Sequence, residues 1–227
     1  MGFITPHLEI LPVEQKRLWP ELKASIVLGF VLYGGTAVAL RLGHRFSVDF
    51  DLFSEKPLDH NAIWSAFPFM PQALVLQDQP NALSVLAPTE NGKKEYVKVS
   101  FYGTIGFGRV GEPDATHDNV LQIASLDDLM ATKVKVILQR IEAKDYRDIA
   151  AMLKANVDLA KALSAARALY GVSFQPSESL KAMTYFKGGD LHSLTKEEKN
   201  ILIRAVSAVR DLPQVTVLSR QLSAQGR

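Results

Sequence analysis

Apolar residues follow two different patterns along this 227-residue chain, and the change between them lies near residue 120. Before it, apolar runs are strand-sized, as at residues 26–33, or alternate with polar residues, as at 48–53. After Ser125, the spacing is that of amphipathic helices. We therefore predict an α+β fold, with residues 1–122 as an α/β core and residues 123–227 as a helical region that packs on it and completes the site.

Turn and cap residues divide the chain into the expected elements. The expected strands are residues 26–33, 48–53, 73–77, 82–86 and 95–102. The expected helices are residues 18–25, 37–42, 58–67, 126–141, 144–153, 159–170, 177–186 and 196–209. Thr36 is predicted to be an N-cap, and Asn91-Gly92 is typical of a hairpin turn. We expect a loop at residues 104–118 and an extended or frayed segment after Pro213.

Composition excludes several classes of protein. The chain has no cysteine, so disulfides, thiolate zinc sites and a cysteine nucleophile are ruled out. The formal net charge is only +2, which does not favour broad binding to nucleic acid. No apolar run is long enough to cross a bilayer, and the N-terminal residues lack the pattern of a signal peptide. We therefore expect a cytoplasmic protein without a membrane partner.

Asp49 and Asp51 form the first candidate site. In an alternating strand they point to one face, while Val48, Phe50 and Leu52 point to the other. Two carboxylates roughly 7 Å apart repel each other unless a cation lies between them. Oxygen ligands favour Mg²⁺, with Mn²⁺ as an alternative. The simpler interpretation is a pair of solvated acids on an exposed strand.

A glycine pair precedes these acids by 15 residues. Gly34 and Gly35 come directly before a predicted helix, where backbone N–H groups and the helix dipole favour a phosphate. Alone, the pair could be a simple turn. Followed by a strand that carries two aspartates, it suggests a phosphate site beside a metal site.

Residues 33–45 and 47–53 resemble the first motif of the AbiEii/AbiGii toxin family. That family belongs to the DNA polymerase β-like nucleotidyltransferases, so the resemblance implies a mixed sheet with flanking helices followed by a helical C-terminal half. It also implies a toxin of a toxin–antitoxin or phage-defence system, with an NTP as substrate and a cognate antitoxin as partner. Some members add nucleotides to tRNA, so tRNA or another RNA is an expected acceptor.

The resemblance also implies roles for the residues of this motif. Asp49 and Asp51 are expected to bind Mg²⁺ and to be catalytic. The residues expected to bind the nucleotide are Gly34, Gly35, Thr36 and Ser47.

A second constellation lies on the predicted helix 126–141. Lys133 falls in the middle of its apolar face, where an unpaired ammonium group is costly. It should therefore meet an anionic partner or line a cleft; alternatively, it reaches past its neighbours to water. Arg140, two helical turns further on and roughly 10 Å away, is nearly in line with it. The two cations could contact a triphosphate or an RNA backbone.

Residues 144–149 contain Asp145 and Asp148 on one side of the next predicted helix. The plain interpretation is that Asp145 interacts with the helix dipole and that Asp148 pairs with Lys144. Residues 126–133 and 144–149 also resemble later motifs of the same family. The resemblance implies that Lys133 is a catalytic residue that contacts the nucleotide, and that Asp145 and Asp148 support nucleotide binding. Arg140 is expected to bind the nucleotide because of its position near Lys133.

One expected group is missing. Polymerase β-like transferases usually take a third carboxylate from a neighbouring strand, and here that position falls on Ser100, which cannot act as a base at neutral pH. Three explanations remain open: two acids and the metal suffice, another acid such as Asp145 approaches, or the protein binds a nucleotide without transferring it. The leading hypothesis is a Mg²⁺-dependent nucleotidyltransferase; the alternatives are a catalytically silent nucleotide-binding regulator and a purely structural protein.

Overall fold

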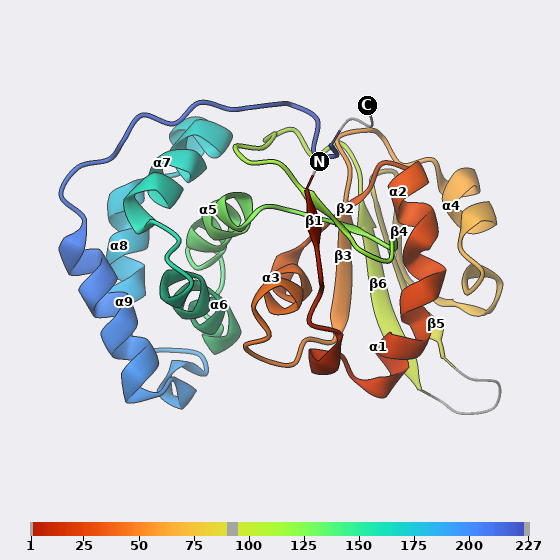
Figure 1. Ribbon diagram of the computed structural model, residues 1–227, viewed down its shortest axis with the longest axis horizontal. Coiled ribbons are helices and arrows are strands. Elements are labelled where there is room, and N and C mark those ends of the chain that lie inside the picture. The colour runs from red at the N-terminus through yellow and green to blue at the C-terminus, as the bar shows by residue number, and fades with distance from the viewer. Residues whose placement is uncertain (1, 90–94, 225–227) are drawn as a thin grey trace. The chain divides into compact units, whose positions relative to one another are not determined.

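The structure, a computed structural model, describes residues 2–89 and 95–224. The chain divides into two compact units, and each is described separately. Unit 1 consists of Met1–Gly108, Glu112–Ala124 and Arg220–Arg227, and unit 2 of Arg109–Gly111 and Ser125–Ser219. In Figure 1 the elements of unit 1 are coloured mainly red to green, and the helices of unit 2 green to blue.

A mixed eight-stranded sheet forms the centre of unit 1 among the described residues, in the order β1-β7-β8-β2-β3-β6-β5-β4. Its strands are β1 (Phe3–Ile4), β2 (Val31–Tyr33), β3 (Asp49–Phe53), β4 (Leu74–Gln79), β5 (Ala82–Pro88), β6 (Tyr96–Tyr102), β7 (Asp114–Thr116) and β8 (Gln122–Ile123). The flanking helices are η1 (Leu8–Ile10), α1 (Val13–Leu18), η2 (Trp19–Lys23), α2 (Ala24–Val27), α3 (Gly34–Leu42), α4 (His60–Ala66) and η3 (Met70–Gln72). The sheet with its flanking helices confirms the predicted α+β class.

One face of this sheet carries the core of unit 1. Phe50 and Leu52 of β3 are fully buried on it, and Trp19 packs on Phe50 with ring centroids 6.2 Å apart. The ring of Phe101 of β6 packs on that of Phe67, just after α4, with centroids 5.0 Å apart. Figure 1 shows α1 and α2 running along the strands. Burying side chains of this size contributes roughly 2–3 kcal/mol each, which fixes the face that β3 turns inward.

The strand expected over residues 26–33 is wrong in its first half. Helix α2 extends to Val27, and the chain then turns at Gly29, whose φ of 77° lies in the left-handed region. Strand β2 begins only at Val31. An apolar run does not distinguish a buried helix end from a buried strand, so its composition could not locate this turn.

The loop expected over residues 104–118 contains strand β7, which sequence reasoning missed together with β1 and β8. Each is two or three residues long, and β1 pairs with β7 through Phe3 opposite Ala115. Strands this short have no readable period and depend on a distant partner. The predicted Asn91-Gly92 turn lies outside the described residues, although β5 and β6 on either side pair antiparallel as a hairpin requires.

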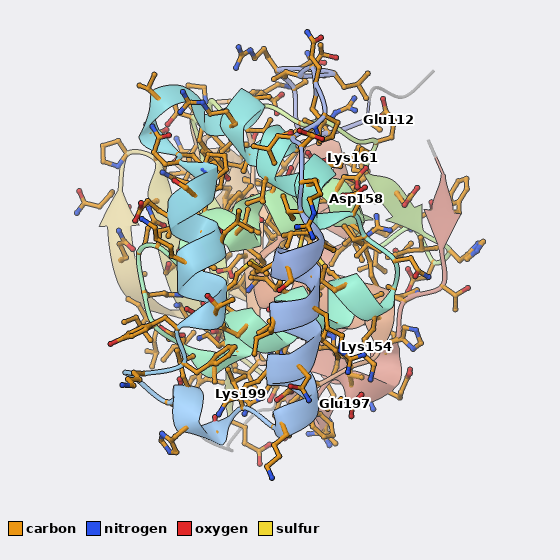
Figure 2. The ribbon with its side chains drawn as sticks, turned by 90° about the vertical axis from the view of Figure 1, so that its left-hand side faces the viewer. Glu112, Lys154, Asp158, Lys161, Glu197 and Lys199 are labelled. Atoms are coloured by element: carbon orange, nitrogen blue, oxygen red, sulfur yellow. The ribbon has the colours of Figure 1, made fainter. Side chains whose placement is uncertain are left out.

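Unit 2 is helical, as predicted. Its helices are α5 (Leu126–Val136), α6 (Ala143–Lys154), α7 (Leu159–Tyr170), η4 (Gly171–Ser173), α8 (Pro176–Thr184), η5 (Leu191–Ser193) and α9 (Lys196–Ala208). Helix α9 begins with a capping box between Thr195 and Glu198. Figure 2 shows Lys154 beside Glu197, and the two form a surface ion pair of 2.6 Å. Such exposed pairs contribute little stability.

Helix α5 is shorter than expected, since it ends at Val136 and not at residue 141. Ile141 was predicted on its apolar face but is 49% exposed, so burial does not extend the helix that far. The chain turns at residues 137–139 and brings Arg140 toward the next helix.

The segment after Pro213 is extended, as predicted, but its end is docked. Leu222 is fully buried in unit 1, where its N–H donates to Glu55 Oε2 at 3.0 Å. The Ala224 N–H donates to Gln122 Oε1, also at 3.0 Å. Specific side-chain acceptors therefore hold this part of the chain.

Candidate active site

Strand β3 presents two carboxylates on the face opposite the core of unit 1. Phe50 and Leu52 are fully buried, whereas Asp49 and Asp51 are partly exposed. This is the alternation predicted from the sequence, and it leaves both acids accessible from one side of the sheet.

The Asp51 carboxylate lies against the start of helix α3. Tyr33 of β2 pairs with Asp51 of β3, and α3 begins directly after Tyr33, at Gly34. A Cβ atom built on Gly34 would lie only 2.6 Å from Asp51 Oδ2, and Gly34 has a φ of 76°. Both features require glycine. The predicted adjacency of the glycine pair and the acid pair is thus observed for Gly34 and Asp51.

The predicted N-cap role of Thr36 is wrong. Tyr33 occupies the N-cap position and makes no side-chain cap, so Thr36 lies within the first turn of α3. Its hydroxyl is buried and forms hydrogen bonds with Ser47 Oγ, at 2.7 Å, and with the Asp49 carbonyl. The two hydroxyls fasten α3 to the start of β3, and each such bond contributes about 1 kcal/mol. Phosphate binding by this turn would therefore depend on backbone N–H groups, which have no partner within a first helical turn.

The parallel strand β6 borders the acid pair on the other side. Its register places Ser100 beside Asp51 and Lys98 beside Asp49. Ser100 is fully buried and accepts a hydrogen bond of 3.0 Å from Ser84 of β5. The position expected for a third acid is thus next to Asp51 but holds a neutral side chain.

Lys98 is a site neighbour that sequence reasoning missed. Alternation places it on the same strand face as Ser100, but its pairing with Asp49 becomes apparent only from the register between β3 and β6. That register depends on packing between two strands whose paired residues lie 49 positions apart in the chain, and alternation alone does not fix it.

Two carboxylates on one strand suit Mg²⁺. This ion commonly takes one or two protein carboxylates and completes its shell with water and substrate phosphates. Within residues 2–89 and 95–224, no group of three or more His, Cys, Asp or Glu side chains forms a cage for a metal. Asp49 and Asp51 are therefore the residues that would hold Mg²⁺, with a substrate supplying further ligands.

The candidate residues of unit 2 form a buried ion-pair network of their own. Lys133 Nζ lies 2.6 Å from Asp145 Oδ1 and 2.7 Å from Asp148 Oδ2. Arg140 Nε lies 2.8 Å from Asp145 Oδ2. The Lys133 side chain is 4% exposed and both aspartate side chains are 0% exposed. The predicted anionic partner of Lys133 is thus observed, and the alternative that its ammonium group reaches water is wrong.

Two expected details of this cluster need correction. Arg140 does not lie on α5 in line with Lys133, because α5 ends first; it binds Asp145 from the loop before α6. Asp148 does not pair with Lys144, which contacts Glu142 at 2.7 Å instead. Lys133 and Arg140 together supply two positive charges opposite the two negative charges of Asp145 and Asp148.

Asp145 is held in its ionised form. Burial opposes ionisation of its carboxyl, but the hydrogen bond from Arg140 and the charge of Lys133 outweigh burial and lower its pKa. Both carboxylate oxygens already accept from these cations. A carboxylate with these partners is a weak base, which argues against Asp145 as the replacement for the missing acid.

Asp128 is a further buried carboxyl in unit 2, and it accepts hydrogen bonds from backbone N–H groups and a hydroxyl. Asp128 accepts from the N–H groups of Val110 and Gly111, at 2.7 and 3.1 Å, and from the Ser125 hydroxyl at 2.6 Å. Burial raises its pKa despite these bonds. Asp128 thus fastens the short segment Arg109–Gly111 to the start of α5.

Comparison with known proteins supports the nucleotidyltransferase assignment. The nucleotidyl transferase AbiEii toxin family model, described as a type IV toxin–antitoxin system, matches residues 25–206. A crystal structure of a candidate nucleotidyltransferase from H. pylori has a TM-score of 0.55 at 18% identity, covering 88% of this chain and 92% of that one. At this identity, the likeness shows the fold alone.

A relative of unknown function comes from Aquifex aeolicus. It is 30% identical over 138 residues, which are 60% of this chain and 63% of the relative. The chain therefore matches less than two thirds of that protein's length.

No helix in the described part of the chain is both long and apolar enough to cross a membrane. The family model covers most of the chain, including β3 and α3, and on this evidence the chain belongs to the nucleotidyl transferase AbiEii toxin family.

Proposed function

We propose that unit 1 is a Mg²⁺-dependent nucleotidyltransferase that transfers a nucleotide from an NTP to an acceptor hydroxyl. The observation that supports it best is the contact geometry at Gly34, where a glycine that opens helix α3 lies against the Asp51 carboxylate. A phosphate at the start of α3 would thus be next to a metal ligand. This is the arrangement that phosphoryl transfer needs, because catalysis there rests on positioning and charge neutralisation.

The residues of unit 1 have different proposed roles in this reaction. The backbone N–H groups of Gly34 and Gly35 would bind phosphate oxygens, aided by the helix dipole. Asp49 and Asp51 would hold Mg²⁺, which when bound neutralises the phosphates and aligns the α-phosphate. The acceptor oxygen forms a bond to the α-phosphorus as the bond to the β-phosphate breaks and pyrophosphate leaves. Ser100 cannot take the proton, so we propose that it passes to water.

An RNA end, for example that of tRNA, is the acceptor that we propose from the family. A cognate antitoxin protein is the partner proposed on the same ground. The proposed role of Lys133, to neutralise charge on the phosphates, requires its ammonium group to contact substrate while it holds Asp145 and Asp148.

The direct test is transfer of label from each of the four NTPs to total tRNA in the presence of Mg²⁺. Asp49→Asn and Asp51→Asn are each expected to reduce transfer on the order of 10³-fold, because each removes a metal ligand. Asp78→Asn is the control, since Asp78 lies on the exposed edge strand β4 of the same unit. Transfer that survives both site substitutions would reject the proposal.

Ser100 motivates a second candidate, a regulator that binds nucleotide without transferring it. Ser100 lies beside Asp51, at the position where a carboxylate would act as the general base. This candidate predicts thermal stabilisation by NTP and Mg²⁺, lost in Asp51→Asn, with no label on any acceptor. A purely structural protein predicts neither stabilisation nor label.

A further inference from the structure

Among the described residues, one lysine lies beside the acid pair on the strands that flank β3 in unit 1. The residues that share the face of Asp49 and Asp51 on strands β2, β6 and β5 are Val31, Tyr33, Tyr96, Lys98, Ser100, Tyr102, Ala82, Ser84, Leu86 and Pro88. Lys98 is the one charged side chain in this set. Its backbone is directly opposite that of Asp49 in the β3–β6 register.

Lys98 and Asp49 do not neutralise each other. Within the described residues, neither side chain forms a hydrogen bond or an ion pair, although the strands that carry them are paired. Both side chains are partly exposed. The lysine ammonium, a compact charge with three donors on a flexible stem, is therefore available to an anion bound above the strand.

The balance of charge on this face favours one divalent ion over two. Sites with two metal ions hold them about 4 Å apart and use them to stabilise both the attacking and the leaving oxygens. Here the neutral Ser100 adds no negative charge beside Asp51, and Lys98 adds a positive charge beside Asp49. A second divalent ion next to Asp49 would meet the repulsion of an ammonium group.

We propose that Lys98 supplies the second positive charge of the site, so that a single divalent cation acts with it. This inference rests on the proposed nucleotidyltransferase function. The Lys98 ammonium contacts a phosphate oxygen of the bound nucleotide on the β6 side, while the metal held by Asp49 and Asp51 contacts the phosphates above β3. Lys98 is then a substrate-binding residue that takes the place of a metal.

The experiment counts metal ions. The whole chain is saturated with a non-hydrolysable NTP analogue, and bound Mn²⁺ is measured by electron paramagnetic resonance over a titration. We expect one Mn²⁺ per chain. Lys98→Met should weaken binding of the analogue about tenfold at fixed Mn²⁺, because it removes a charge-assisted hydrogen bond, and Lys98→Arg should restore most of it. Lys56→Met, at an exposed position after β3, is the control and should leave binding unchanged.

Two results would overturn the proposal: two Mn²⁺ ions per wild-type chain, or equal affinity of the analogue for wild type and Lys98→Met. The number of Mn²⁺ ions bound to the wild-type chain tests the proposal even if Lys98→Met does not fold. Failure of the underlying function gives a different pattern, because Asp49→Asn and Asp51→Asn would then leave Mn²⁺ binding unchanged.

Discussion

The two charged clusters of this protein are built in opposite ways. In unit 1, Asp49 and Asp51 lie partly exposed on a strand face, and within the described part of the chain Asp49 forms no ion pair. In unit 2, Lys133 and its aspartate partners are buried, and every charge has an opposite one within 2.8 Å.

This difference indicates that charged side chains stabilise the fold in unit 2 and bind a ligand in unit 1. A buried, balanced network is costly to break, because removing one partner leaves an uncompensated charge in a medium of low polarity. Two partly exposed carboxylates on one strand face stabilise the fold little, and a bound cation relieves their mutual repulsion. We therefore expect charge removal to affect folding in unit 2 and ligand binding in unit 1.

The largest effect on stability is expected for Lys133→Met. The substitution keeps the length of the side chain but removes the ammonium group that contacts both buried aspartates. We expect a loss of about 3–5 kcal/mol in the free energy of unfolding, measured by thermal and urea denaturation. Lys161→Met, which removes an exposed partner of Asp127, is the matched control and should cost under about 1 kcal/mol. Similar values for both would show that the buried network does not carry stability.

A smaller effect is expected for Gly34→Ala. The new Cβ would meet Asp51 Oδ2 at 2.6 Å in a left-handed backbone conformation. The strain should cost about 1–3 kcal/mol and displace the carboxylate, so affinity for NTP with Mg²⁺ should fall as well. Gly29→Ala has a similar φ but open space around it, so it separates backbone strain from the contact with Asp51. If both variants bind nucleotide equally, the contact at Gly34 has no role in the site.

Acid should weaken unit 2 through Asp145. Its pKa is lowered in the folded protein, so its contribution to stability is complete above the ordinary value of 3.8 and is lost as pH falls below it. Wild type should therefore lose stability faster than Asp145→Asn when denaturation is followed from about pH 5 to pH 3. Parallel curves for the two proteins would contradict this assignment.

The smallest effect on stability is expected for Asp49→Asn. Relief of repulsion with Asp51 should leave the free energy of unfolding within about 0.5 kcal/mol of wild type, or raise it slightly. The same protein should lose nucleotide transfer. A large loss of stability would show that Asp49 is a structural residue, and the contrast between the two clusters would disappear.

Much of the candidate site could be predicted because it is local in sequence. The alternation in β3 placed Phe50 in the core and Asp51 on the open face, as observed. The burial cost of an ammonium group predicted that Lys133 has an anionic partner or lines a cleft, and anionic partners are observed. Both inferences use neighbours within one element, where geometry is fixed by the period.

The remainder depends on contacts between distant segments. Lys98 faces Asp49 only because β3 and β6 pair in one particular register. The Thr36 hydroxyl binds Ser47 and so does not cap its helix. Arg140 lies outside α5, which ends at Val136. The apolar spacing of the sequence continues to Ile141, but burial does not.

The order in which the chain visits its two units limits how the protein can be divided. The chain enters unit 2 for Arg109–Gly111, returns to unit 1, enters unit 2 again at Ser125, and contributes once more to unit 1 from Arg220. Neither unit is therefore encoded by one uninterrupted stretch. A fragment ending before Arg109 would lack the Gln122 and Leu222 contacts of unit 1, and one starting at Ser125 would lack the backbone donors to Asp128. Laboratory dissection of this protein thus calls for circular permutation or internal deletion in place of simple truncation.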